Sequence, residues 1–185
     1  MLAHRILFDE QTIAIRVQTL AHSIARDLPE SAPVLIGLLT GAFIFLADLV
    51  RALARLEIES EVDLMAVSHY GSPIPSNGMA QLHKDCVLDL NGRSVLLVDD
   101  ILDSGLTLSM VRAHLAAKNP RWLRSCVLLD KPSRRQAAIN ADYVGFEAPD
   151  AWMIGYGMDA YGQGRGLPYI ATLQPADPVA TDVIR

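Results

Sequence analysis

Residues 94–107 read Ser-Val-Leu-Leu-Val-Asp-Asp-Ile-Leu-Asp-Ser-Gly-Leu-Thr, and this stretch decides the fold. After its first residue the run from Ser94 to Val98 is entirely apolar, which is typical of a strand buried on both faces of a parallel sheet. The polar residues from Asp99 to Thr107 lead into a helix that we expect to reach about Lys118. A buried strand, a short polar turn and a helix together form half of a βαβ unit.

The same pattern recurs along the rest of the chain. Apolar residues at helical spacing predict helices from Asp9, which caps the first one, to about Leu28 and from Ala42 to about Leu56. Further strands are expected at Pro33–Leu39, Ile58–Ser68, Ser125–Asp130, Asp142–Phe146, Trp152–Tyr156 and, as an edge strand, Tyr169–Leu173. The alternation predicts a single α/β domain over residues 1–185, with an open, mostly parallel sheet and helices on both faces.

Composition narrows the classes of function. With 16 Lys and Arg against 21 Asp and Glu, the chain has a net charge of −5, so we expect no nucleic-acid partner. No apolar run approaches the roughly 20 residues that span a bilayer, and no signal peptide is recognisable, so we expect no membrane partner and a cytoplasmic protein. Cys86 and Cys126 match no metal-ligand spacing and are expected to be reduced and buried.

The turn after Val98 has the composition of a phosphate cradle. Gly105 allows close approach of the backbone, Ser104 and Thr107 offer hydroxyl groups, and amides that open a helix point their N–H groups at one spot. Open α/β sheets bind ligands beyond the carboxyl ends of their strands, which is where this turn lies. The structural alternative is that Ser104 or Asp103 only caps the helix.

Three carboxylates accompany this cradle. Asp99 and Asp100 could accept hydrogen bonds from sugar hydroxyls or support a divalent cation, and Asp103 could take a proton from a reacting group. The alternative for the Asp pair is a solvated strand end.

This string closely resembles the signature of the type I phosphoribosyltransferases, in which two acidic residues precede a loop that holds the 5-phosphate of phosphoribosyl pyrophosphate. Other segments, in the same order along the chain, are similar to the hypoxanthine-guanine branch of that family. They are Ile36–Phe43, Ser68–Gly71, Leu128–Pro132, Asp142–Asp150 and Gly155–Asp159.

The resemblance implies a role for each matching residue. The phosphoribosyl group would contact Asp99, Asp100, Asp103, Ser104, Gly105, Leu106 and Thr107, with Asp103 as the general base. Pyrophosphate would contact Leu39, Thr40, Gly41 and Arg165. The purine would contact Lys131, Trp152, Met153 and Asp159, where Lys131 faces the 6-oxo group and Trp152 stacks on the ring. The cofactor would be Mg²⁺, held at Asp99, Asp100 and Asp159.

The resemblance also implies a small purine-binding hood, a mobile catalytic loop at about 69–85 and a homo-oligomer, either dimer or tetramer. The chain departs from the family at Thr40, where lysine is usual, at His69, where serine is usual, and at Asp99, where glutamate is more usual. Taken alone, Lys131 could be a solvated charge at a strand end, Arg165 could be a solvated loop residue, and Trp152 could be a core residue.

The implied reaction is purine salvage, in which the 5-phosphoribosyl group moves from phosphoribosyl pyrophosphate to hypoxanthine or guanine and IMP or GMP and pyrophosphate are formed. The alternative is a regulator of the same fold that senses nucleotides and binds RNA or DNA, and the net charge of −5 counts against it. A receiver domain is excluded because its acidic pair follows the first strand, whereas Asp99 comes much later in this chain.

Overall fold

The structure is a computed structural model and describes residues 3–29, 32–68 and 81–173. Most of the predicted mobile loop, together with His69, lies outside these residues and stays a prediction. In the described part of the chain, no helix is both long enough and apolar enough to cross a membrane. Cys86 and Cys126 are free and buried, as expected.

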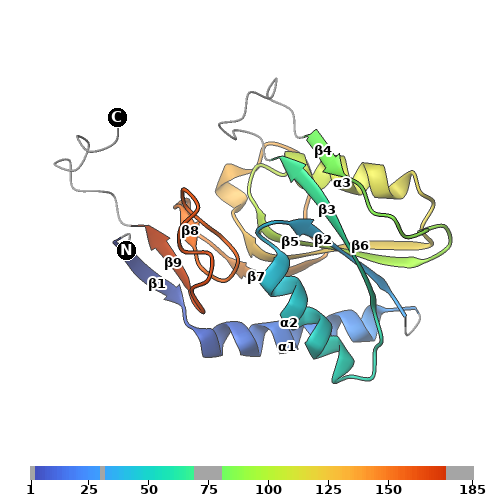
Figure 1. Ribbon diagram of the computed structural model, residues 1–185, viewed down its shortest axis with the longest axis horizontal. Helices are drawn as coiled ribbons and strands as arrows, with labels where there is room; N and C mark the ends of the chain where they lie inside the picture. Colours follow the sequence, from blue (N-terminus) through green and yellow to red (C-terminus); the bar gives the residue numbers. More distant parts are fainter. Residues whose placement is uncertain (1–2, 30–31, 69–80, 174–185) are drawn as a thin grey trace.

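Within the described residues, the main sheet consists of β2 (Val34–Leu39), β3 (Glu61–Ser68), β4 (Gln81–Lys84), β5 (Ser94–Leu102), β6 (Trp122–Asp130) and β7 (Tyr143–Glu147). The order across the sheet is β4-β3-β2-β5-β6-β7, with β2 and β5 at its centre (Figure 1). Every neighbouring pair is parallel except β3 with β4. The predicted open, mostly parallel sheet is therefore confirmed.

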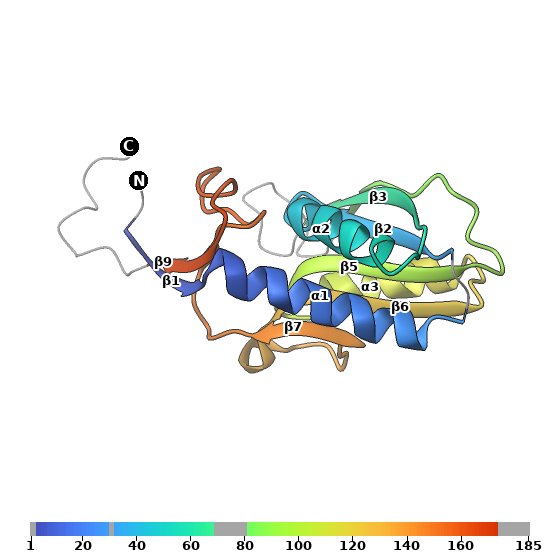
Figure 2. The ribbon, with the colours of Figure 1, turned by 90° about the horizontal axis from the view of Figure 1, so that it is seen from below.

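Helices cover both faces of this sheet, which explains why its central strands are apolar without alternation. Leu35 and Leu96 pack in one cluster with α1 (Glu10–Asp27) and α2 (Phe43–Ala54). Their neighbours Ile36 and Leu97 point the other way and pack with α3 (Leu106–Ala116). Figure 2 shows α3 on the opposite side of the sheet from α1 and α2. Asp9 caps α1 as predicted, since its carboxylate accepts a hydrogen bond from the Thr12 amide at 2.8 Å.

A second sheet forms the hood, defined here as β1 (His4–Phe8) together with residues 151–173. Its strand order is β1-β9-β8, where β8 is Met153–Ile154 and β9 is Ile170–Leu173. The prediction of β9 as an edge strand is wrong, because the amino-terminal β1 pairs with its outer side. β1 escaped prediction because its three central residues are all exposed and leave no alternating pattern.

Two further boundaries differ from the prediction. β5 continues past Val98 to Leu102, because its backbone pairing with β6 extends through Asp99 and Leu102. The acidic pair therefore lies inside a strand rather than in the turn after it. Residues 81–84, expected as part of a loop, form β4, and all four side chains are exposed, so no burial pattern marked the strand.

Candidate active site

The carboxyl end of β5 carries two adjacent buried carboxylates. Asp99 is 3% exposed and Asp100 9% exposed, so they are not a solvated strand end. Burial, together with the neighbouring charge of Asp100, raises the pKa of the Asp99 carboxyl well above its usual range. The Asp100 amide donates a hydrogen bond to Asp99 Oδ1 at 2.9 Å. Two buried acidic groups at this position favour a bound cation.

The turn after β2 packs directly against this acidic pair. A Cβ atom on Gly41 would lie 1.9 Å from Asp100 Oδ2, so no side chain fits there. A Cβ atom on Gly157, in the hood, would lie 2.1 Å from the carbonyl oxygen of Gly41. The turn that contains Leu39 and Thr40 thus lies between the acidic pair and the hood.

The loop from Asp103 to Gly105 leads into α3, and residues 135–137 bond its backbone carbonyl groups. Residue 105 has a φ of +83°, which favours glycine, and it is the N-cap of α3 without a side-chain cap. Neither Asp103 nor Ser104 is the N-cap residue, although Ser104 Oγ accepts a hydrogen bond from the Leu106 amide at 3.4 Å. The capping alternative is therefore wrong for Asp103 and partly right for Ser104. The Ser104 carbonyl accepts hydrogen bonds from the amides of Gln136 and Ala137, at 2.9 and 3.0 Å.

The backbone groups of this loop differ in their hydrogen bonding. The carbonyl oxygens of Leu102 and Asp103 also accept hydrogen bonds, in both cases from the Arg135 guanidinium. The first amides of α3 have no partner inside the helix, and that of Leu106 has only a long hydrogen bond to Ser104 Oγ, at 3.4 Å, so these amides can donate to a bound anion.

The carboxylate of Asp103 stands at the tip of this loop. Its side chain is 40% exposed, and its Oδ1 accepts a hydrogen bond from Arg134 Nε at 2.8 Å. Arg134 follows β6 in a short 3-10 helix, η1 (Pro132–Arg134), and also bonds Asp150 at 3.1 Å.

Lys131 is buried at the end of β6, with 5% of its surface exposed, so the solvated alternative is wrong. Its Nζ donates a hydrogen bond to the carbonyl oxygen of Ala151 at 2.7 Å. Burial lowers the pKa of this ammonium group. A buried donor at the carboxyl edge of the sheet, electrostatically coupled to Asp103, is suited to bind a carbonyl oxygen of a ligand.

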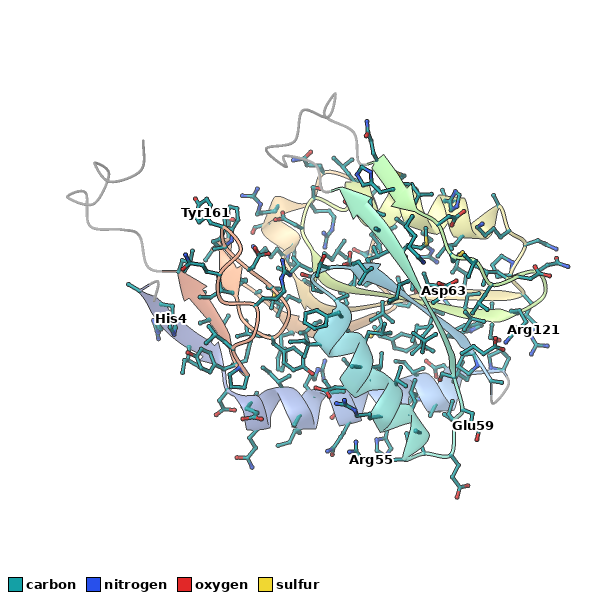
Figure 3. The ribbon with its side chains drawn as sticks, in the orientation of Figure 1. His4, Arg55, Glu59, Asp63, Arg121 and Tyr161 are labelled. Carbon is teal, nitrogen blue, oxygen red and sulfur yellow. The ribbon has the colours of Figure 1, made fainter. Side chains whose placement is uncertain are left out.

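Trp152 is 58% exposed and is therefore not a core residue. Its Nε1 donates a hydrogen bond to the carbonyl oxygen of Asp159 at 3.1 Å, and its ring lies parallel to that of Tyr161, with the centroids 6.0 Å apart. Figure 3 shows Tyr161 on the hood, away from the main sheet. Met153 is buried in β8, so any contact of this residue with a ligand would be made by its backbone.

Asp159 and Arg165 pair with each other inside the hood. Arg165 also bonds the carbonyl oxygen of Gly157, the residue that packs on Gly41. Arg165 is therefore not a solvated loop charge, and its partner Gly157 lies against the turn at residues 39–41. The pyrophosphate assignment stays a prediction.

The three carboxylates assigned to magnesium are not gathered into one cluster. In the described part of the chain, no group of three or more acidic, histidine or cysteine side chains could hold a metal. Asp99 and Asp100 interact with each other, whereas Asp159 is bonded to Arg165 in the hood. The magnesium assignment stays a prediction.

Four charged residues of the site were not predicted: Asp130, Arg134, Arg135 and Asp150. Arg135 is 15% exposed and pairs with Asp130 in addition to the loop carbonyls. A clue was present in the sequence, since both arginines follow Lys131 closely. Two consecutive arginines, however, look the same in the sequence whether they are solvated or bonded to other parts of the protein.

Comparisons with known proteins agree with this geometry. Residues 5–160 match the family model of the phosphoribosyl transferase domain. The hypoxanthine-guanine phosphoribosyltransferase of Aquifex aeolicus is 47% identical over 167 residues, which cover 90% of this chain and 92% of the relative.

Solved structures match over the same extent. A hypoxanthine-guanine phosphoribosyltransferase from Bacillus anthracis superposes with a TM-score of 0.85 at 36% identity and covers 94% of this chain and 99% of its own. The Trypanosoma cruzi hypoxanthine phosphoribosyltransferase in complex with the product IMP gives 0.85 at 37% identity and covers 95% of this chain and 96% of its own.

Proposed function

The chain belongs to the hypoxanthine-guanine phosphoribosyltransferases, enzymes of purine salvage, and from this premise we propose the substrates and the residues of its reaction. The 5-phosphoribosyl group passes from phosphoribosyl pyrophosphate to hypoxanthine or guanine, which gives IMP or GMP and pyrophosphate. None of the relatives named above is a regulator, and no observation favours the regulatory alternative.

One observation carries this proposal. Lys131, a buried donor, and Trp152, an exposed aromatic residue, meet at Ala151, beside the loop that bears Asp103. A donor without acceptor capacity fits a 6-oxo group, and an aromatic face fits a purine ring. The carboxylate of Asp103 is then available for a proton on a ring nitrogen.

The remaining residues bind the phosphoribosyl donor. The amides of the loop at residues 104–107 receive the 5-phosphate, and the Ser104 and Thr107 hydroxyls add donors. Leu39, Thr40 and Gly41 present the turn to pyrophosphate, with Arg165 on its hood side. Asp99 and Asp100 lie between these two sites in sequence and accept hydrogen bonds from the sugar hydroxyls.

The transfer balances in one step. An electron pair of the base nitrogen forms the bond to C1 of the ribose while the bond from C1 to the pyrophosphate oxygen breaks. The proton released by the base passes to Asp103. Asp99, Asp100 and Asp159 are the residues that would hold magnesium, and the ion would supply positive charge for the pyrophosphate leaving group. The buried acidic pair fits such a cation.

A panel of bases tests the function. The protein is incubated with phosphoribosyl pyrophosphate, magnesium and hypoxanthine, guanine, xanthine or adenine, and nucleoside monophosphate is measured. We expect IMP and GMP to form. Absence of nucleotide with all four bases, in a protein that still unfolds cooperatively, would reject the proposed reaction.

We also propose a homo-oligomer, dimer or tetramer, that acts in the cytoplasm. This rests on the family membership and not on a contact seen in the structure. Sedimentation equilibrium tests it directly, and a mass of 20.2 kDa at all concentrations would identify a monomer instead.

A further inference from the structure

Two consecutive arginines hold Asp103 by different groups. Arg134 donates from Nε to the side-chain Oδ1 at 2.8 Å. Arg135 donates to the main-chain carbonyl of Asp103 and to that of Leu102, the latter at 3.1 Å. Both the backbone and the carboxylate of Asp103 are therefore fixed by the segment that follows β6.

Arg134 bonds Oδ1 of the Asp103 carboxylate. Each carboxylate oxygen can accept two hydrogen bonds, so bonding at Oδ1 leaves Oδ2 available for a substrate proton. The guanidinium is itself held at a second point, because it bonds Asp150 Oδ1 at 3.1 Å. A planar guanidinium bonded at two points has little freedom to rotate.

Stability alone does not account for this arrangement. The side chains of Arg134, Asp103 and Asp150 are 49%, 40% and 58% exposed, and ion pairs at such exposure contribute little to folding. A partly exposed Asp103 would otherwise rotate freely about its side-chain bonds. A general base acts only from within hydrogen-bond reach of the proton that it takes.

Arg134 also ties the carboxylate to the purine side of the site. Asp150, its second partner, lies two residues before Trp152, and the neighbouring Ala151 accepts the hydrogen bond of Lys131. Residues 131–134 and 150–152 thus connect the carboxylate of Asp103 with Lys131 and Trp152, the two residues proposed to bind the purine.

We propose that Arg134 is a positioning residue for the transfer reaction, which holds Asp103 by Oδ1 so that Oδ2 faces the base nitrogen, with Asp150 as its second anchor. This role rests on the proposed function, since it requires Asp103 to be the general base.

The test compares Arg134→Gln with Arg134→Lys and with the control Arg124→Gln. Arg124 is 48% exposed and pairs with Asp142 at 2.7 Å, so it matches Arg134 in exposure and bonding but follows the start of β6, at the other end of the strand. Single-turnover rates are measured, because product release can mask the chemical step in kcat.

We expect Arg134→Gln to slow the single-turnover rate about tenfold or more, since small misplacements of a catalytic group have effects of this order. The KM values for both substrates should stay within about twofold of wild type, because the lost interaction acts in the transition state. The solvent deuterium isotope effect should rise, Arg134→Lys should recover part of the rate, and Arg124→Gln should match wild type.

A double-mutant cycle with Asp103→Asn shows whether Arg134 acts through Asp103. Arg134→Gln should have no further effect in the Asp103→Asn background. An equal slowing in both backgrounds, an unchanged rate in the single variant, or a raised KM for phosphoribosyl pyrophosphate at unchanged rate would each overturn the positioning role. Wild-type turnover by Asp103→Asn alone would reject the base assignment itself, so the two failures are distinguishable.

Discussion

Replacing Lys131 by methionine tests how the purine is read. The ammonium group of Lys131 has three donor hydrogens, and one of them bonds Ala151 at 2.7 Å, so two remain for a ligand. Methionine is similar in length and carries no donor. The substitution therefore removes the group proposed to bind the 6-oxo oxygen while it largely fills the same space.

The expected magnitude follows from burial and charge. A hydrogen bond from a charged donor contributes about 1.5–3 kcal/mol. Since 1.36 kcal/mol is about one decade in rate, kcat/KM for hypoxanthine should fall about ten- to a hundredfold. Adenine presents an amino group at position 6, which opposes an ammonium donor, so its use should fall less or improve. Most of the discrimination between the two bases should disappear.

Folding should change little in this variant. The carbonyl of Ala151 loses a donor, which costs about 1 kcal/mol. Removal of a buried ammonium, whose pKa burial already lowers, has the opposite effect on stability. The thermal midpoint should therefore stay close to that of wild type.

The assay is kcat/KM for hypoxanthine and for adenine, with thermal unfolding as the check on folding. Lys118→Met is the control, because the Lys118 ammonium is also paired, with Asp85 at 2.9 Å, but lies beyond the end of α3. A hypoxanthine-to-adenine ratio equal to that of wild type would show that Lys131 does not read the base, whatever the absolute rates.

Three further predictions concern the turn, the metal and acid stability. Gly41→Ala should raise KM for phosphoribosyl pyrophosphate more than KM for the base, because the new Cβ would lie 1.9 Å from Asp100 Oδ2; equal changes in both KM values would contradict this reasoning. Exhaustive chelation should abolish turnover, with recovery on addition of magnesium, and full activity in chelator would show that protein cations suffice. Burial alone would raise the pKa of Asp85, but hydrogen bonds from Lys118, His114 and the Cys86 amide outweigh this effect and lower the pKa from 3.8. The ionised carboxylate therefore stabilises the folded protein above about pH 4, and this stabilisation is lost as the pH falls further. Asp85→Asn should therefore be less stable than wild type at neutral pH, with a difference that shrinks in acid; a difference independent of pH, measured by denaturant unfolding, would refute this.

The elements that the sequence predicts well are those whose burial leaves a pattern. Leu35 and Leu96 are surrounded by other apolar residues because both faces of the central strands are covered. β4 and β1 leave no such pattern, since their side chains are mostly exposed and their positions depend on partners distant in sequence. The pairing of β1 with β9 joins residues near opposite ends of the chain, and local periodicity carries no information on such a contact.

The residues of the site likewise fall into those that the sequence predicts and those that only the structure brings together. Asp99, Asp100 and Asp103 stand in one short string behind a buried strand, so their proximity follows from the sequence. The bond between Asp103 and Arg134 spans 31 positions, and no spacing rule connects two such residues. The same holds for Asp150 and for Arg135 with the loop carbonyls, which required the three-dimensional arrangement of β5 and β6.

The distribution of charge in the site supports the need for a cation that accompanies the substrate. Among residues 3–29, 32–68 and 81–173, the arginines near the site already bond carboxylates: Arg134 with Asp103, Arg135 with Asp130 and Arg165 with Asp159. None of the ion pairs in these residues includes Asp99 or Asp100, the most deeply buried pair. A bare pyrophosphate would meet the Asp100 carboxylate beside Gly41, with Asp99 next to it and no cation among these residues paired with either, and the repulsion would oppose binding. When the diphosphate binds together with a divalent cation, the repulsion is replaced by attraction, because the cation is attracted by both the acidic residues and the phosphates. Binding of the donor should therefore depend on the cation before any chemistry occurs.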